Sequence, residues 1–174
     1  MNTDQRERVE VEKRSDVAAH RHLPALKLDR HAPNVQLMAV QLNHTIIWCR
    51  DKARSARFLT EILGLPEPAA FFNFLVVPLE NGISLDFAET EKPEISPQHY
   101  AFLISEAEFD GVFARVKARG LTSWADPARH RRNEINRNDG GRGFYFEDPE
   151  GHSLEVLTRP YGSGRIRHAT YIAS

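Results

Sequence analysis

The sequence predicts an α+β fold made of two βαβββ modules, and three repeated features support this prediction. A β-rich run precedes an amphipathic helix in each half, and the helices end at Gly64 and Gly120. His44 lies 20 positions before Gly64, and His99 lies 21 positions before Gly120. Each half closes on a similar strand, GISLDF in the first and GHSLEV in the second. Since neither half can bury its sheet alone, we expect the two to close around a shared interior.

The first module begins with a β-rich run at 42–48, followed by Asp51 as a helix N-cap. The helix stops at Gly64, a residue that adopts the left-handed conformation of a helix end. Two strands are then expected at 72–79 and 83–89, joined by a tight Asn-Gly turn. The apolar face of the helix is formed by Ala56, Leu59, Ile62 and Leu63.

The second module begins with a strand at 99–105, and Ser105 with Glu108 has the spacing of a capping box. The helix that follows carries its apolar residues at Phe109, Val112, Phe113 and Val116. A short strand is expected at 121–124. After a polar loop, RGFYFE and HSLEVL form a hairpin across the turn DPEG.

The composition is that of an ordinary globular protein, with a formal net charge of −1 and one cysteine. This balance indicates neither a nucleic-acid nor a membrane partner, and Cys49 alone cannot form an intrachain disulfide. The N-terminus lacks the apolar core of a signal peptide, and no apolar run is long enough to span a membrane. We therefore expect a cytoplasmic location.

The first 36 residues mix both charge signs and show no lasting periodicity, so we expect a mobile extension. An upstream mis-called start codon is an alternative explanation, because Met38 directly precedes the β-rich run. The expected divisions are an extension at 1–36, one domain at 37–162 with modules at 40–90 and 97–160, and a tail at 163–174.

Strand alternation places four polar side chains on the faces turned away from the helices. They are His44 and His99 on the first strands, and Asp86 and Glu155 on the last strands. If these faces are concave, the four side chains point into one cavity. Two histidines and a carboxylate with open positions suit a divalent metal such as Fe(II), Mn, Ni, Co or Zn. A metal would also compensate the charge of a buried carboxylate.

The chain also resembles a known family. The doubled pattern, together with LNHTIIWCRD, ARFLTEILGL, HYAFLI and GFYFEDPEGHSLEVLTRPYG, is similar to the vicinal oxygen chelate superfamily. That superfamily includes glyoxalase I, extradiol dioxygenases, fosfomycin-resistance enzymes and bleomycin-binding proteins, and the resemblance covers about residues 38–162. It implies a U-shaped, partly closed mixed sheet with helices outside, in a homodimer. It also implies His44, His99 and Glu155 as metal ligands, with Asp86 at the position of a further ligand.

The resemblance implies a metal-dependent enzyme of isomerase, lyase or dioxygenase type that acts on a small oxygen-chelating substrate. In that hypothesis Glu155 is the catalytic carboxylate, because it holds the divalent metal. The alternative is a non-catalytic protein that binds a small molecule or an antibiotic, as bleomycin-resistance proteins do. Either protein has a small-molecule ligand and no nucleic-acid or membrane partner.

Four other features have both a functional and a structural interpretation. The arginine-rich loop at 126–141 is either a lid hinged at Gly140–Gly141 or a solvated surface loop, and the second is slightly favoured. Tyr161 is placed to fold over the mouth of the cavity. His152 faces away from Glu155 by alternation and is predicted to be structural. Cys49 is predicted to be buried under the helix and inert.

Overall fold

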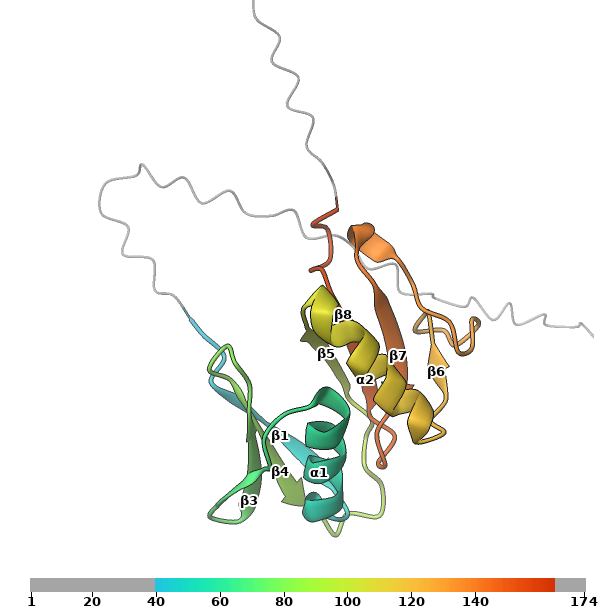
Figure 1. Ribbon diagram of the computed structural model, residues 1–174. Helices are drawn as coiled ribbons and strands as arrows, with labels where there is room; N and C mark the ends of the chain where they lie inside the picture. The colour runs from blue at the N-terminus through green and yellow to red at the C-terminus, as the bar shows by residue number, and fades with distance from the viewer. Residues whose placement is uncertain (1–39, 165–174) are drawn as a thin grey trace, which may run out of the picture. The chain divides into compact units, whose positions relative to one another are not determined.

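The computed structural model describes residues 40–164, and these contain two successive βαβββ modules (Figure 1). The first module comprises β1 (His44–Cys49), α1 (Lys52–Leu63), β2 (Ala69–Phe71), β3 (Phe74–Pro78) and β4 (Ser84–Glu89). The second comprises β5 (His99–Leu103), α2 (Glu106–Ala118), β6 (Ser123–Trp124), the 3₁₀ helix η1 (Asn138–Gly140), β7 (Gly143–Glu147) and β8 (Ser153–Leu157). The extension predicted at 1–36 and most of the tail predicted at 163–174 lie outside the described residues.

The two modules build their sheets in the same way. The strand orders are β1-β4-β3-β2 and β5-β8-β7-β6, so the first and last strands of each module are neighbours. This pair of first and last strands lies at one edge of each sheet and is parallel, and the remaining pairs are antiparallel. Each helix lies across its own sheet (Figure 1). The predicted α+β fold of two mixed-sheet βαβββ modules is confirmed.

The strand register places equivalent residues at equivalent positions of the two sheets. His44 lies opposite Ser84 in the first module, as His99 lies opposite Ser153 in the second. Asp86 pairs with Ile46, and Glu155 pairs with the corresponding Ala101. The polar residues singled out by the repeat therefore lie on the parallel strand pair of each module.

The helix ends follow their sequence signals. The Asp51 carboxylate accepts a hydrogen bond from Arg54 N at 2.9 Å, and Gly64 ends α1 with a φ of 77°. In α2 the capping box is complete, since Ser105 and Glu108 each bond the backbone of the other. These local interactions satisfy backbone groups that a helix end would otherwise leave without partners.

The core lies between each sheet and its helix. Ile47 and Cys49 of β1 and Leu154 and Val156 of β8 are all buried, as alternation predicts. An aromatic cluster fills the second module, in which the rings of Phe109 and Phe144 meet edge to face with centroids 5.5 Å apart. The opposite faces of β1 and β5 carry exposed residues, His44, Ile46, Trp48, His99, Ala101 and Leu103.

One strand of the first module differs from the prediction. The run predicted as a single strand at 72–79 is a tight turn followed by β3, and the turn is preceded by the additional strand β2. Phe72 has a φ of 50°, a conformation that side chains other than glycine rarely adopt. A strand of three exposed residues carries no alternation, so the pattern of side chains gives no signal for it.

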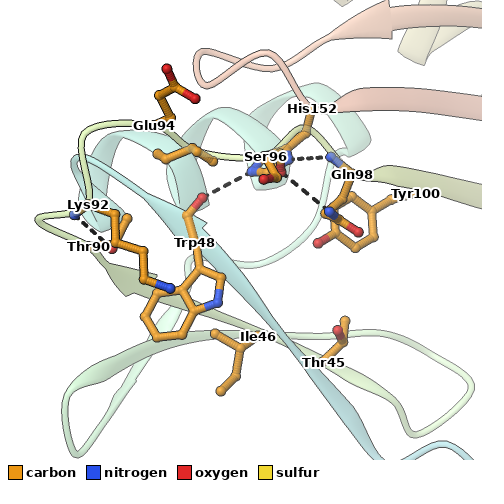
Figure 2. A pocket seen from close by; sticks show the side chains of 11 residues that line it. Thr45, Ile46, Trp48, Thr90, Lys92, Glu94, Ser96, Gln98, Tyr100 and His152 are labelled. Atoms are coloured by element: carbon orange, nitrogen blue, oxygen red, sulfur yellow. Dashed lines mark hydrogen bonds between the residues drawn. The ribbon is translucent and has the colours of Figure 1, made fainter.

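His152 joins the two modules through its ring. The Gln98 backbone N–H donates to Nδ1 at 3.0 Å, so Nε2 carries the ring hydrogen and donates to the Trp48 carbonyl at 3.0 Å (Figure 2). His152 is buried beside Tyr100, whose ring meets it edge-on. Both ring nitrogens are therefore engaged by backbone groups, which agrees with the structural role predicted for this histidine.

Among residues 40–164, neither helix has the length and apolar character that a membrane span requires.

Candidate functional site

The strongest candidate site is a histidine-carboxylate pair on the second sheet. Neighbouring strands β5 and β8 bring His99 Nε2 to 3.2 Å from Glu155 Oε2. The Glu155 side chain is 3% exposed, whereas that of His99 is 50% exposed. The other ring nitrogen of His99 faces Ser153 Oγ at 3.5 Å. A buried carboxylate thus meets an imidazole that is open to solvent on its other side.

Two tyrosines cover the remaining oxygen of Glu155. The Tyr161 hydroxyl donates a hydrogen bond to Oε1, because an ionised carboxylate only accepts. A phenol has a single hydrogen, so the Tyr161 oxygen accepts from the Tyr145 hydroxyl at 2.8 Å. Burial and the bond to Glu155 raise the pKa of Tyr161 to about 12, and burial raises the pKa of Tyr145 still further. Both phenols therefore stay protonated and act as donors at neutral pH.

The His99–Glu155 pair fits two cis ligands of one divalent ion. Ligand atoms about 2.1 Å from a metal lie about 3.0 Å apart at an angle of 90° and about 3.4 Å apart at a tetrahedral angle. The observed separation of Nε2 and Oε2 is 3.2 Å, which lies between these values. Imidazole nitrogen and carboxylate oxygen are also ligands that first-row divalent metals accept. The residues present therefore fit the metal that the sequence predicts, although two ligands alone leave the site incomplete.

The equivalent pair of the first module has a different environment. His44 is exposed and its Nδ1 donates to Asn43 Oδ1 at 2.9 Å, while Asp86 accepts from Ser84 Oγ at 2.8 Å. His44 and Asp86 line a separate pocket of about 540 Å³ on the first sheet. Within residues 40–164, no three His, Cys, Asp or Glu side chains converge to hold a metal. The structure thus joins His99 to Glu155 and leaves His44 and Asp86 apart from them.

Several arginines of the loop at 126–141, and Arg142 directly after it, are paired with groups of the same chain. Arg129 pairs with Glu147 and lies over the Trp124 ring, and Arg142 pairs with Glu106 and Asp110. Arg131 pairs with Asp126, and Arg132 donates to Thr122 Oγ1 at 3.1 Å. These cations already have partners, which favours the surface-loop interpretation over a lid that receives an anionic substrate.

The glycines of this loop mark a packed contact. A Cβ atom on Gly141 would lie 2.7 Å from Thr158 Oγ1 and 2.9 Å from Arg159 Cγ. Because these distances are shorter than ordinary contacts, a side chain at this position would force Thr158 or Arg159 to shift. Gly141 is therefore a close approach to the segment after β8, and the predicted hinge finds no support in its surroundings.

A second pocket of about 430 Å³ lies where β1 meets the connection between the modules (Figure 2). Trp48, Lys92, Gln98 and Tyr100 are among the residues that line it.

On the other side of β1, Cys49 is fully buried, and burial raises the pKa of its thiol to about 11. The prediction of a buried Cys49 is confirmed, and its raised pKa makes it a poor nucleophile at neutral pH.

Tyr145 is the residue of this site that strand alternation could have identified. In β7, Phe144 and Phe146 are buried in the core, which turns Tyr145 to the opposite face. The register places Tyr145 directly opposite Glu155. The same period-two argument that selected Glu155 therefore selects Tyr145, once the hairpin of β7 and β8 is aligned.

Comparison with known proteins agrees with this architecture. The family model of the Glyoxalase/Bleomycin resistance protein/Dioxygenase superfamily matches residues 41–156. The solved structure of Oxidase ChaP-H2 is similar with a TM-score of 0.71 and 58% sequence identity, over 74% of this chain and 100% of that one. The Glutathione transferase FosA of Serratia marcescens is 30% identical over 125 residues, which cover 68% of this chain and 81% of that protein. The Metallothiol transferase FosB of Shouchella clausii (strain KSM-K16) is 34% identical over 103 residues, 58% of this chain and 64% of that protein.

Proposed function

We propose that this chain, which belongs to the Glyoxalase/Bleomycin resistance protein/Dioxygenase superfamily, is a metal-dependent oxidase of a small oxygen-chelating substrate. The observation that carries the proposal is the pair of Glu155 and His99, at 3.2 Å, on the sheet face away from the helix. A carboxylate that is 2% exposed is costly without a cation nearby, and His99, which lies beside it among the described residues, is of a type that commonly binds metals.

The choice of an oxidase over an isomerase or lyase rests on similarity. Oxidase ChaP-H2 is 58% identical to this chain and is covered over its whole length. The two proteins named as transferases are far less similar, at 30% and 34% identity. A set of two histidines and one carboxylate with open positions is also typical of non-haem Fe(II) oxygenases. Fe(II) is therefore the first candidate metal, ahead of Mn, Co, Ni and Zn.

The third ligand is proposed to be His44 of the partner subunit in a homodimer. His44 occupies the same register position in β1 as His99 in β5, and its side chain is exposed. The strand faces that carry both histidines also expose apolar side chains, with Trp48 at 49% and Leu103 at 59%. A second copy of the chain would cover these faces and bring an imidazole to the His99–Glu155 pair. Asp86 lines the His44 pocket and is proposed to shape its polarity.

When bound, the divalent metal would hold two neighbouring oxygens of the substrate and provide the redox centre for reaction with dioxygen. Glu155 is the proposed catalytic residue because it would hold the metal directly through Oε2. His99 would hold it through Nε2, and its orientation is supported by Ser153 on the neighbouring strand.

Metal content tests the proposal. The purified protein is expected to bind one divalent ion per chain, and both His44→Ala and Glu155→Gln should reduce this stoichiometry strongly. His130→Ala is the matched control, because His130 is an exposed histidine whose side chain pairs with Asp126 on the surface. Oxygen consumption with candidate catechol-like or hydroxyketone substrates should depend on the added metal. A folded wild-type protein that binds no metal would contradict the enzyme and favour the non-catalytic binder.

A further inference from the structure

The segment that follows β8 is fastened to the arginine-rich loop by one aspartate. Asp139 Oδ2 accepts from Gly162 N at 3.0 Å, and Oδ1 accepts from Gly164 N at 3.1 Å. The approach is close, since a Cβ on Gly164 would lie 2.4 Å from Asp139 Cα. Gly162 has a φ of 77°, which a glycine adopts without strain. The chain direction immediately after Tyr161 is therefore set by Asp139, 22 residues earlier in the sequence.

A second contact holds the same segment at its other end. Thr158 N donates to the Arg142 carbonyl at 2.9 Å, and Arg142 N donates to Thr158 Oγ1 at 2.8 Å. Tyr161 lies between these two attachments. Although the residue is 57% exposed, its hydroxyl is turned inward onto Tyr145 and Glu155. Without such attachments, a segment outside the helices and strands would not hold a tyrosine in one orientation.

The two carboxylate oxygens of Glu155 have different partners. Oε1 accepts from Tyr161, whereas Oε2 faces His99 Nε2 at 3.2 Å. A free carboxylate could rotate to offer either oxygen or both to a metal. The Tyr161 hydroxyl bonds Oε1 and so leaves Oε2, on the side of His99, as the oxygen that can bind a metal.

We propose that Tyr161, held in place by Asp139, is a positioning residue that fixes Glu155 as a one-oxygen ligand through Oε2. This inference rests on the proposed function, since it concerns the same metal site. It gives the loop at 126–141 a role that the sequence did not indicate, because the loop places Tyr161 without contacting Glu155. Hydrogen-bonding partners of this kind typically change metal affinity by about 10- to 100-fold.

The test compares metal affinity among variants by competition with a chelator, using Mn(II) and Co(II) as probes. Tyr161→Phe is expected to bind about 10-fold more weakly or worse. The visible absorption of bound Co(II) should change as well, because the carboxylate can then offer both oxygens. Asp139→Asn should weaken binding in the same direction while keeping the tyrosine. Glu134→Gln is its control, since it removes one exposed carboxylate from the same loop.

The outcomes separate this inference from the proposed function. If the wild-type protein is folded and binds neither metal, the proposed function fails and this inference falls with it. If the wild type binds metal, but Tyr161→Phe has the same affinity and the same Co(II) spectrum, only the positioning role is overturned. Tyr145→Phe keeps the Tyr161 bond to Glu155, so a loss as large as that of Tyr161→Phe would also contradict the assignment. Melting of the metal-free proteins checks that each variant is folded.

Discussion

Replacing His152 with alanine should destabilise the protein more than any change to an exposed histidine. The ring is 1% exposed and forms two hydrogen bonds at 3.0 Å, one from Gln98 N and one to the Trp48 carbonyl. The variant loses both bonds and leaves a backbone donor and a backbone acceptor without partners. These groups belong to different modules, so the variant also removes a tie between the modules.

The expected magnitude follows from these contacts. Each hydrogen bond contributes about 1 kcal/mol net. The space left by the ring beside Tyr100 costs about 1–2 kcal/mol more, at the lower end for a removed core side chain. The sum is about 3–4 kcal/mol in the free energy of unfolding. With a urea dependence of about 2 kcal/mol per molar, the unfolding midpoint should fall by about 1.5–2 M.

Urea unfolding, followed by tryptophan fluorescence and by circular dichroism, measures this shift. His130→Ala is the control, because the His130 side chain is 81% exposed, and its cost should stay within about 0.5 kcal/mol. Metal-free protein is used for all measurements, so that metal binding does not contribute to the stability. A midpoint shift for His152→Ala no larger than that of the control would refute the claim that His152 ties the modules together.

Three further predictions concern single groups. Cys49, with its pKa raised to about 11 by burial, should react with a thiol reagent only after unfolding, and rapid reaction of the native protein would contradict its buried position. Hydrogen bonds from Ser105 hold the pKa of Glu108 below its ordinary value, so their contribution to stability is present at neutral pH and is lost as the pH falls. The melting temperature of Ser105→Ala should therefore approach that of the wild type between about pH 5 and about pH 3, whereas a constant gap would show that this carboxylate plays no part. Gly141→Ala should destabilise the protein by about 1–3 kcal/mol, because its Cβ would overlap Thr158 and Arg159, and an unchanged melting temperature would show that the loop is not packed there.

Much of the fold could be predicted because it depends on local signals. Asp51 and Gly64 mark the ends of α1, and the Ser105–Glu108 capping box begins α2. Strand alternation placed His99 and Glu155 on one face, and the register of β5 and β8 then brings them together. These inferences need only residues that are close in sequence or related by the repeat.

The unpredicted features depend on distant partners or on unusual backbone conformations. Strand β2 depends on a turn in which Phe72, and not the neighbouring Asn73, has the positive φ, and a phenylalanine does not predict this conformation. Tyr161 was expected over the mouth of the cavity, but its attachment depends on hydrogen bonds from Gly162 and Gly164 to Asp139, which no periodicity encodes. The sequence does not show that Arg129 and Arg142 are paired, because their acidic partners, Glu147 and Glu106, lie on other elements. Sequence patterns identify faces, but they do not identify which side chains meet across a loop.

Mixing two defective variants tests the shared metal site most directly. His44→Ala and Glu155→Gln each remove one ligand, and each variant alone should bind little metal. If His44 of the partner subunit completes the site, a dimer formed from one chain of each kind contains one intact site. Unfolding and refolding an equal mixture should then restore metal binding to about a quarter of the wild-type stoichiometry, since about half of the dimers are mixed and one site in two is intact. If a refolded mixture that contains mixed dimers recovers no metal binding, this result contradicts the shared site.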